Sequence, residues 1–404
     1  MSSPTRMIFY PFVEGAALHE EGSYRLWVLN HSSAVLWCLY EEHGPGDRLV
    51  AAYADHFDLS LGQARADVDN ALAEFVQTGL LSKFPVPSPQ SPAPAFKPPA
   101  PAFKPPAPVL KSPVPSSQVP ARKVPQCWHK TCQLAGVSWQ ISSVDADAAE
   151  KWFDCFVHLE TNLASTDLHY DLIESSSGWM LTGPDESVGG LAEEEVLPWL
   201  LTMLFAELCK RQPHHLLLHA AALCLDDRLL LLPGESAFGK STLAAALATH
   251  DWVLYSDELA PLNPDTLKVA PFPLPIGIKS RSLSALQSYY PDLTAQAACR
   301  RADGQFVRYL ATSQISLADP DVNPAPVAAL IFPRYRPDAV TCLTRLTPLQ
   351  ALERLAQTGS SERPLRSKDV EALLALAGQR PCWSLDYCNL EEAVKEVSTA
   401  WSLC

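Results

Sequence analysis

The feature that most constrains this chain is the motif GESAFGKST at residues 234–242, which has the pattern GxxxxGK[ST]. It follows the apolar run 229–232, which predicts a buried strand, and it opens the alanine- and leucine-rich run 243–248, which predicts a helix. In such a strand, loop and helix, backbone N–H groups point at phosphates, a lysine reaches the outer phosphates and a hydroxyl holds Mg²⁺. The alternative is a Gly/Ser turn that binds no ligand. The predicted nucleotide-binding residues are Gly234, Glu235, Ser236, Ala237, Phe238, Gly239, Lys240, Ser241 and Thr242.

The composition indicates a globular chain and excludes several classes of partner. With 404 residues and 47% hydrophobic residues, the chain is long enough for two domains with their own cores. The net charge of −14 and the lack of a basic block argue against binding to nucleic acid. We see no signal peptide and no apolar stretch that could span a membrane, so we expect a cytoplasmic protein without a membrane partner. The 11 cysteines form no CxxC pair, which favours free thiols over disulfides or a zinc site.

A proline-rich segment divides the chain. The heptad PAPAFKP occurs at residues 92–98 and 99–105, and the degenerate copy PAPVLKS follows at 106–112. Proline at this density removes backbone donors and fixes φ, which predicts an extended spacer, although a ligand for proline-recognition domains is the alternative. We therefore expect an N-terminal domain at residues 1–83, a linker at 84–126 and a nucleotide-binding domain at 127–404.

The N-terminal domain reads as a small α/β unit without a catalytic cluster. Residues 24–29 alternate as a strand does, and Asn30 is placed to cap a helix over residues 34–40. Asp47 is expected to cap a second helix, and Ser60 with Gln63 forms a capping box for a third. The periodicity predicts a module of the size of a winged helix.

Three short stretches of this module resemble the PqqD family, whose members are also called recognition elements of ribosomal-peptide biosynthesis. They are LNHSSA at 29–34, DLS at 58–60 and FVQTGLL at 75–81. The resemblance implies that the module binds the leader of a ribosomally synthesised precursor peptide as an added strand. A helical cap domain that only packs on its neighbour is the alternative.

Residues 127 to about 215 contain stretches typical of a scaffold. Strands are expected at 137–141 and 169–173, and a helix at 193–208. The run 216–225 predicts one long central strand that contains His219, and 252–255 predicts another buried strand. The second strand leads into carboxylates beside the phosphate loop, where α/β nucleotide-binding folds place metal ligands and bases.

Three motifs occur in the order and spacing of HPr kinase/phosphorylase-like proteins. They are LHAAA at 218–222, the loop at 234–242 and YSDEL at 255–259. The resemblance implies an α/β fold in which a P-loop lies within a phosphoenolpyruvate-carboxykinase-like core, and an activity that phosphorylates a serine hydroxyl. The winged-helix-like PqqD domain would precede this core.

The resemblance also implies roles for single residues. Catalysis would use Lys240, His219 near the phosphates, and Asp257 as general base, and the metal ligands would be Ser241, Asp257 and Glu258. Glu258 stands where the family usually has a second aspartate, and Ala237 replaces a common loop glycine. From the residues alone, His219 reads more readily as a core histidine. Asp257 alone could be a turn residue at a strand end, but beside a phosphate loop the functional reading is favoured.

The region after these motifs supplies further cations. Lys279, at the end of the proline-containing loop 271–279, or Arg281 just after it could reach the nucleotide or the acceptor. A strand at 327–332 precedes Arg334 and Arg336, which are candidates for a phosphate clamp. Capping residues at Thr347 and Asn389 predict two further helices.

These observations predict a kinase that uses ATP or GTP with Mg²⁺ and phosphorylates a Ser or Thr of a peptide or protein, most simply a precursor peptide. Two alternatives stay open. One is a kinase for a free small molecule such as an amino acid, and the other is a non-catalytic nucleotide-binding peptide carrier. Both a monomer and a homo-oligomer are compatible with the sequence.

Overall fold

The computed structural model describes residues 6–81, 128–235, 237–358 and 363–404, so the predicted linker and Ser236 lie outside the described residues. The chain forms two compact units. The described residues of the first unit are 6–81 together with Leu346–Gln357 and Pro364–Gln379, and the second unit contains the remainder. Two segments from the C-terminal third of the sequence therefore cluster with the N-terminal module, a grouping that local sequence patterns do not reveal.

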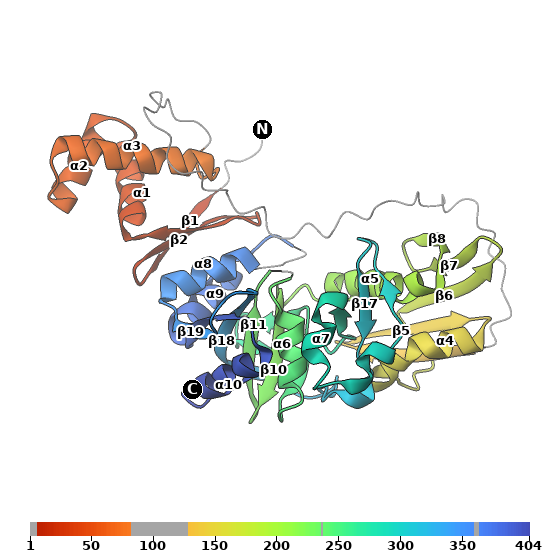
Figure 1. Cartoon of the computed structure of the whole chain (residues 1–404). Helices are drawn as coiled ribbons and strands as arrows, with labels where there is room; N and C mark the ends of the chain where they lie inside the picture. The colour runs from red at the N-terminus through yellow and green to blue at the C-terminus, as the bar shows by residue number, and fades with distance from the viewer. Residues whose placement is uncertain (1–5, 82–127, 236, 359–362) are drawn as a thin grey trace. The chain divides into compact units, whose positions relative to one another are not determined.

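The N-terminal module is a three-stranded antiparallel sheet followed by three helices (Figure 1). Its elements are β1 (Met7–Phe12), β2 (Gly15–Glu20), β3 (Leu26–Asn30), α1 (His31–His43), α2 (Asp47–Phe57) and α3 (Leu61–Gln77). The strand expected at 24–29 corresponds to β3, whereas β1 and β2 were not predicted. The reason is burial: four consecutive residues of β2, from Ala16 to His19, are buried, so this strand shows no alternation of polar and apolar residues.

Local capping explains where these helices begin. The Asn30 side chain accepts a hydrogen bond from the Ser33 N–H at 2.9 Å, and Ser60 and Gln63 form the predicted capping box. The expectation for Asp47 was wrong, because Gly46 occupies the cap position and Asp47 is the first helical residue. There its carboxylate is favoured by the helix dipole.

The helices bury one apolar face against the sheet. The core of the module includes Leu18 from β2 and Leu36, Leu49 and Leu72 from the three helices. Each such leucine contributes about 1.5–3 kcal/mol on burial. The unit also contains α8 (Pro348–Thr358) and α9 (Ser367–Gln379), and the Leu365 N–H between them donates to the Ser23 carbonyl at 3.0 Å.

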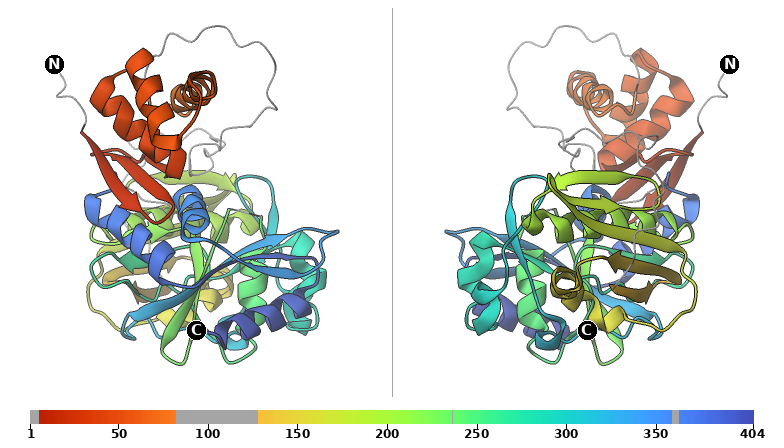
Figure 2. Two further views of the ribbon diagram at one scale, coloured as in Figure 1. Left: turned by 90° about the vertical axis from the view of Figure 1, so that its left-hand side faces the viewer. Right: turned by 90° about the vertical axis from the view of Figure 1, so that its right-hand side faces the viewer.

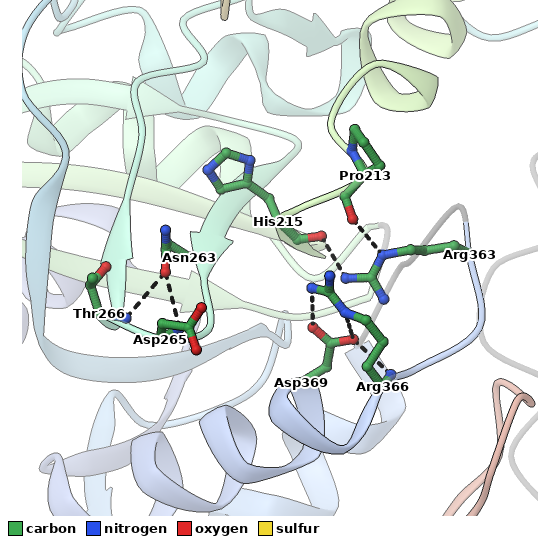
Figure 3. Close-up of polar contacts among 8 residues, drawn as sticks. All are labelled: Pro213, His215, Asn263, Asp265, Thr266, Arg363, Arg366 and Asp369. Atoms are coloured by element: carbon green, nitrogen blue, oxygen red, sulfur yellow. Dashed lines mark hydrogen bonds and ion pairs between the residues drawn. The ribbon is translucent and has the colours of Figure 1, made fainter.

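Arg363 and Arg366 precede the first residue of α9, and Figure 3 shows their hydrogen bonds. In the first unit, the Arg366 N–H and guanidinium donate to the fully buried Asp369 carboxylate at 2.7–3.2 Å. In the second unit, the Arg363 guanidinium donates to the carbonyls of Pro213 at 2.8 Å and His215 at 3.1 Å. These bonds fix both ends of the short connection to α9.

The second unit begins with a five-stranded sheet in the order β4-β5-β6-β7-β8. Its elements are β4 (Trp128–Leu134), β5 (Val137–Ser143), α4 (Ala146–Phe153), β6 (Leu168–Ser175), β7 (Gly178–Thr182), β8 (Ser187–Leu191) and α5 (Glu193–Lys210). The strands expected at 137–141 and 169–173 and the helix expected at 193–208 lie within β5, β6 and α5. Trp139, Phe156 and Tyr170 fill the core beneath this sheet.

The central sheet carries the predicted phosphate loop. Its strands follow the order β12-β10-β11-β18-β14-β13-β9, and β20 and β19 continue from β18. They are β9 (Leu216–Leu218), β10 (Ala220–Leu225), β11 (Arg228–Pro233), β12 (Val253–Ser256), β13 (Ala260–Asn263), β14 (Lys268–Val269), β18 (Ala325–Tyr335), β19 (Cys342–Arg345) and β20 (Cys382–Tyr387). The helices α6 (Lys240–Leu247) and α10 (Leu390–Trp401) pack side by side in this unit (Figure 2). A small sheet in the order β15-β17-β16 consists of β15 (Gly277–Lys279), β16 (Cys299–Arg300) and β17 (Phe306–Tyr309), and the short helix α7 (Leu283–Leu286) follows β15.

The single long strand expected at 216–225 was wrong, because the chain breaks at His219. Residues before the break form β9 and pair with β13, whereas residues after it form β10 and pair with β11 and β12. The sequence gives no sign that the pairing strand changes at His219. Every other residue of the run is hydrophobic, because the run is buried on both sides. No helix among the described residues is both long enough and apolar enough to cross a membrane.

Candidate functional site

The described residues of the motif at 234–242 form the connection between β11 and α6 and the first turn of α6. Gly239 caps α6 with a left-handed φ of 89°, and its carbonyl accepts the Leu243 N–H at 2.9 Å. A Cβ at Gly239 would lie 2.2 Å from the Tyr387 hydroxyl, so both the conformation and the packing require glycine. Ala237 also has a positive φ, 79°, which is rare for a residue with a side chain. The N-terminus of α6 therefore stands beside a tightly shaped backbone turn, which is an arrangement that can bind anions.

The side chain of Lys240 lies inside this turn and is only 6% exposed. Its Nζ donates to the carbonyls of Gly234 at 2.6 Å and Glu235 at 3.2 Å, and it lies 3.1 Å from His219 Nε2. Burial lowers the pKa of Lys240 to about 8, although the nearby carboxylates of Glu258 and Asp257 oppose this shift. An anionic ligand would compensate this buried charge better than two carbonyl groups do.

His219 sits at the break between β9 and β10, and this break directs it into the site. It is 8% exposed, and burial together with the Lys240 charge lowers its pKa to about 4. Glu258 Oε1 lies 3.7 Å from its Nε2, a distance that would make an ion pair only with a protonated ring. Because the pKa is so low, the ring is neutral at pH 7, and Nε2 can accept a hydrogen bond from Lys240.

Asp257 and Glu258 follow the end of β12 and face different surroundings. Asp257 is 8% exposed, and its Oδ1 has no hydrogen-bond partner among the described residues. Burial, with a smaller contribution from Glu258, raises the pKa of Asp257 to about 7. The Glu258 side chain is 52% exposed and lines a cavity in front of the loop. The structure thus brings Lys240, Ser241, His219 and both carboxylates together.

The cavity has a volume of about 280 Å³. We call its lining from the small sheet β15-β17-β16 and the residues next to it the first wall, and its lining at the ends of β18 and β20 the second wall. The first wall carries the cations Lys279, Arg281 and Arg301, and the Arg281 guanidinium donates to the Ala237 carbonyl at 3.5 Å. Burial, Arg301 and Arg281 lower the pKa of Lys279. This wall includes both expected cations, Lys279 at the end of the loop 271–279 and Arg281 after it.

The second wall carries Tyr335, Tyr387 and Cys388. Sequence analysis missed these residues as well as Arg301. The signal that could have found the tyrosines is their place at the end of two apolar runs, since strands that end beside a phosphate loop supply its ligand contacts.

Arg334 and Arg336 do not form the expected phosphate clamp. The Arg334 guanidinium donates to the Asp386 carboxylate at 2.8 and 3.4 Å, and Arg336 Nε lies 3.9 Å from the same carboxylate. Neither arginine lines the cavity. The prediction failed because their acidic partner lies on β20, which pairs with β18 but is distant in sequence.

The described residues contain no group of three or more His, Cys, Asp or Glu side chains that could hold a metal by themselves. Ser241, Asp257 and Glu258 lie together at the loop, but a cation there would need further ligands. Mg²⁺ in nucleotide sites is usually held by one or two protein groups together with phosphate oxygens and water. The donor set therefore suits a metal that arrives with a nucleotide. The ten described cysteines form no disulfide with one another.

The N-terminal module presents an open sheet edge. Its strand order is β1-β2-β3, so β3 pairs with β2 along one side only among the described strands. The Trp27 indole on β3 donates to the Thr78 carbonyl at 3.2 Å, which links the edge strand to the end of α3. An edge strand backed by a helix is a template for an added peptide strand.

Comparisons with known proteins give different results for the two parts of the chain. Residues 14–81 match the family described as Coenzyme PQQ synthesis protein D (PqqD). No curated protein matches the chain. Among solved structures, the HPr(Ser) kinase/phosphatase from Coxiella burnetii aligns with a TM-score of 0.22 and 12% identity, over 46% of this chain and 98% of that protein. The N-terminal module is thus a PqqD domain, whereas a likeness of this size assigns neither a fold nor an activity to the second unit.

Proposed function

We propose that this chain is a kinase that transfers the γ-phosphate of a Mg²⁺-bound nucleoside triphosphate to a Ser or Thr hydroxyl of a peptide held by its PqqD domain. One observation carries the proposal: the buried Asp257 carboxyl, whose Oδ1 has no hydrogen-bond partner among the described residues, lies near the buried Lys240 at the start of α6. A turn without a ligand would have no reason to bury a lysine and a carboxylic acid at one helix N-terminus, because each ionised group loses hydration there.

The phosphates would bind at the turn between β11 and α6. Backbone N–H groups at the α6 N-terminus would donate to phosphate oxygens, and the helix dipole favours negative charge there. Lys240 would exchange its two carbonyl partners for phosphate oxygens, which offer full negative charge. Arg281 already touches the turn and would add a second cation beside the outer phosphate.

Ser241 and Asp257 would hold Mg²⁺, with Glu258 beside them. The unpartnered Oδ1 of Asp257 leaves a lone-pair site available for such a ligand bond. The metal, when bound, neutralises charge on the phosphoryl oxygens.

Transfer requires a base for the acceptor hydroxyl. The proton passes from the hydroxyl to a carboxylate, the hydroxyl oxygen bonds to the γ-phosphorus, and the bond to the β–γ bridging oxygen breaks to leave a nucleoside diphosphate. Asp257 is the proposed base because its buried carboxyl lies at the phosphate loop; its pKa of about 7 belongs to the ligand-free site, and Mg²⁺ on Oδ1 would lower it. Glu258 lines the cavity, so Glu258→Gln is the variant that tests whether this more exposed carboxylate acts as the base instead.

The acceptor would be a peptide because of the fused PqqD domain. A segment added along the free side of β3 would bind through main-chain hydrogen bonds, and its side chains would supply selectivity. Such a tethered recognition domain raises the local concentration of the acceptor at the transferase unit. The role that follows is modification of a ribosomally made peptide.

The experiment is transfer of label from γ-³²P-ATP with Mg²⁺, using the full chain and the short peptides encoded beside its gene. We expect label on a peptide Ser or Thr, and loss of transfer in Lys240→Met. The matched control is Lys268→Met, because Lys268 is an exposed lysine of the same unit outside the site. Tight ATP binding without transfer would instead support a nucleotide-binding peptide carrier, and label on free amino acids would support a small-molecule kinase.

A further inference from the structure

Tyr335 is a large aromatic side chain that remains 48% exposed at the cavity beside the phosphate loop. It is the last residue of β18, and Tyr387 is the last residue of β20. The two rings meet edge to face, with centroids 5.8 Å apart at 72°. Tyr387 is buried, so Tyr335 is the ring whose surface faces the cavity.

The sheet places these tyrosines on one side of the loop and the carboxylates on the other. β18 is parallel to β11 and β20 is parallel to β18, so the three strands end at the same edge. β12, which leads into Asp257, lies on the other side of β11 from β18, and β10 lies between β12 and β11. A ligand whose outer phosphate lies near Asp257 and Lys240 would therefore extend its other end across the loop toward Tyr335.

We propose that the nucleobase of the nucleoside triphosphate stacks on Tyr335, with Cys388 and Leu390 beside it on the same wall. This inference rests on the proposed nucleotide binding and adds where the base lies and how it is recognised. An aromatic ring stacks on the face of a purine or pyrimidine, and an exposed ring at a cavity wall offers such a face.

Short contacts fix Tyr335 and Tyr387 to the phosphate loop. The Tyr335 N–H donates to the Phe238 carbonyl at 3.0 Å, and the Tyr387 hydroxyl donates to the Gly239 carbonyl at 3.1 Å. A Cβ on Gly239 would lie 3.2 Å from the Tyr335 Cβ. Because the loop and the ring hold each other in place, the base and the phosphates would bind to one preformed surface.

The chemistry of this wall indicates weak selection among bases. Its described cavity-lining side chains are two tyrosines, a thiol and a leucine, and none is an amide or a carboxylate that would read a base edge. Stacking depends on the π-face that every base has, so we expect ATP and GTP to bind with affinities within about tenfold of each other.

The test compares Tyr335→Ala with Tyr335→Phe in the full chain, by calorimetric titration with Mg²⁺-ATP, Mg²⁺-GTP and Mg²⁺-tripolyphosphate. We expect Tyr335→Ala to weaken both nucleotides by about tenfold or more, since stacking on an aromatic residue is worth that much per base. Tripolyphosphate, which has no base, should bind all three proteins equally, and Tyr335→Phe should keep nucleotide affinity. Equal ATP affinity in Tyr335→Ala and wild type would refute stacking of the base on Tyr335, whereas the proposed nucleotide binding at the loop would still stand.

Alkylation of Cys388 gives a second readout. Both Cys388 and Cys342 are exposed thiols of the second unit, but only Cys388 lines the cavity. We expect ATP to slow modification of Cys388 and not of Cys342, and tripolyphosphate to protect neither. If ATP and tripolyphosphate both fail to bind, the proposed function itself fails. If ATP binds and leaves Cys388 fully reactive, the base lies elsewhere.

Discussion

Asp257→Asn is expected to stabilise the ligand-free second unit at neutral pH. Burial raises the pKa of Asp257 from 3.8 to about 7, and the neighbouring Glu258 carboxylate adds to the shift. Each tenfold change in a proton equilibrium corresponds to about 1.4 kcal/mol, so ionisation of Asp257 costs about 4 kcal/mol more in the folded protein than in the unfolded chain. Asparagine keeps the shape of the side chain but carries no charge.

The size of this effect depends on pH. Below pH 3.8 the carboxyl is protonated in both states and contributes nothing. Between there and about pH 7 the folded protein keeps a proton that the unfolded chain releases, so stability falls as pH rises. Above that range the penalty is constant. Asp257→Asn should therefore gain about 2–4 kcal/mol at pH 8 and less than about 1 kcal/mol at pH 4.

Denaturant-dependent hydrogen exchange of the β11 and α6 amides measures this gain, because it follows unfolding of the second unit separately from the first. The matched control is Asp338→Asn, which removes an exposed carboxylate of the same unit. It should change stability by less than about 0.5 kcal/mol at both pH values. An equal effect of Asp257→Asn at pH 4 and pH 8, or a loss of stability at pH 8, would refute the reasoning from burial.

Three further predictions follow from the site. Gly239→Ala should destabilise the second unit by about 1–3 kcal/mol in thermal unfolding, because its Cβ would clash with the Tyr387 hydroxyl at a left-handed φ; an unchanged melting temperature would contradict the packing. The His219 ring should titrate near pH 4 in NMR, well below an exposed histidine, because burial and Lys240 lower its pKa. Arg281→Ala should weaken Mg²⁺-ATP binding about tenfold in calorimetry, whereas Arg334→Ala, which loses only its pair with Asp386, should leave it unchanged.

The parts of this protein that were predicted correctly are those specified by neighbouring residues. The capping box at Ser60 and Gln63 and the side-chain cap at Asn389 depend on residues three apart, so the sequence contains the whole signal. The loop between β11 and α6 is equally local. Clustering of Lys240 with Asp257 could be anticipated because strands β11 and β12 run in the same direction and end at one edge.

The parts that were missed depend on pairing between distant strands. Arg334 meets Asp386 only because β18 and β20 are neighbours, although the two residues are 52 positions apart. Tyr335 and Tyr387 form one cavity wall for the same reason. The break of the predicted strand at His219 was hidden because both halves are buried, and burial on both faces removes the alternation that would mark a change of direction.

The electrostatics of the site distinguish a functional cluster from a structural ion pair. In a structural pair, the partner's charge would lower the pKa of an aspartate and raise that of a lysine. Here the pKa of Asp257 is raised and that of Lys240 is lowered, although Lys240 lies close enough to oppose the shift at Asp257. Burial outweighs attraction for both groups, so the ligand-free protein holds two poorly compensated charges. A phosphate beside Lys240 and a cation beside Asp257 would each supply the missing opposite charge, which is why we read this cluster as a binding site.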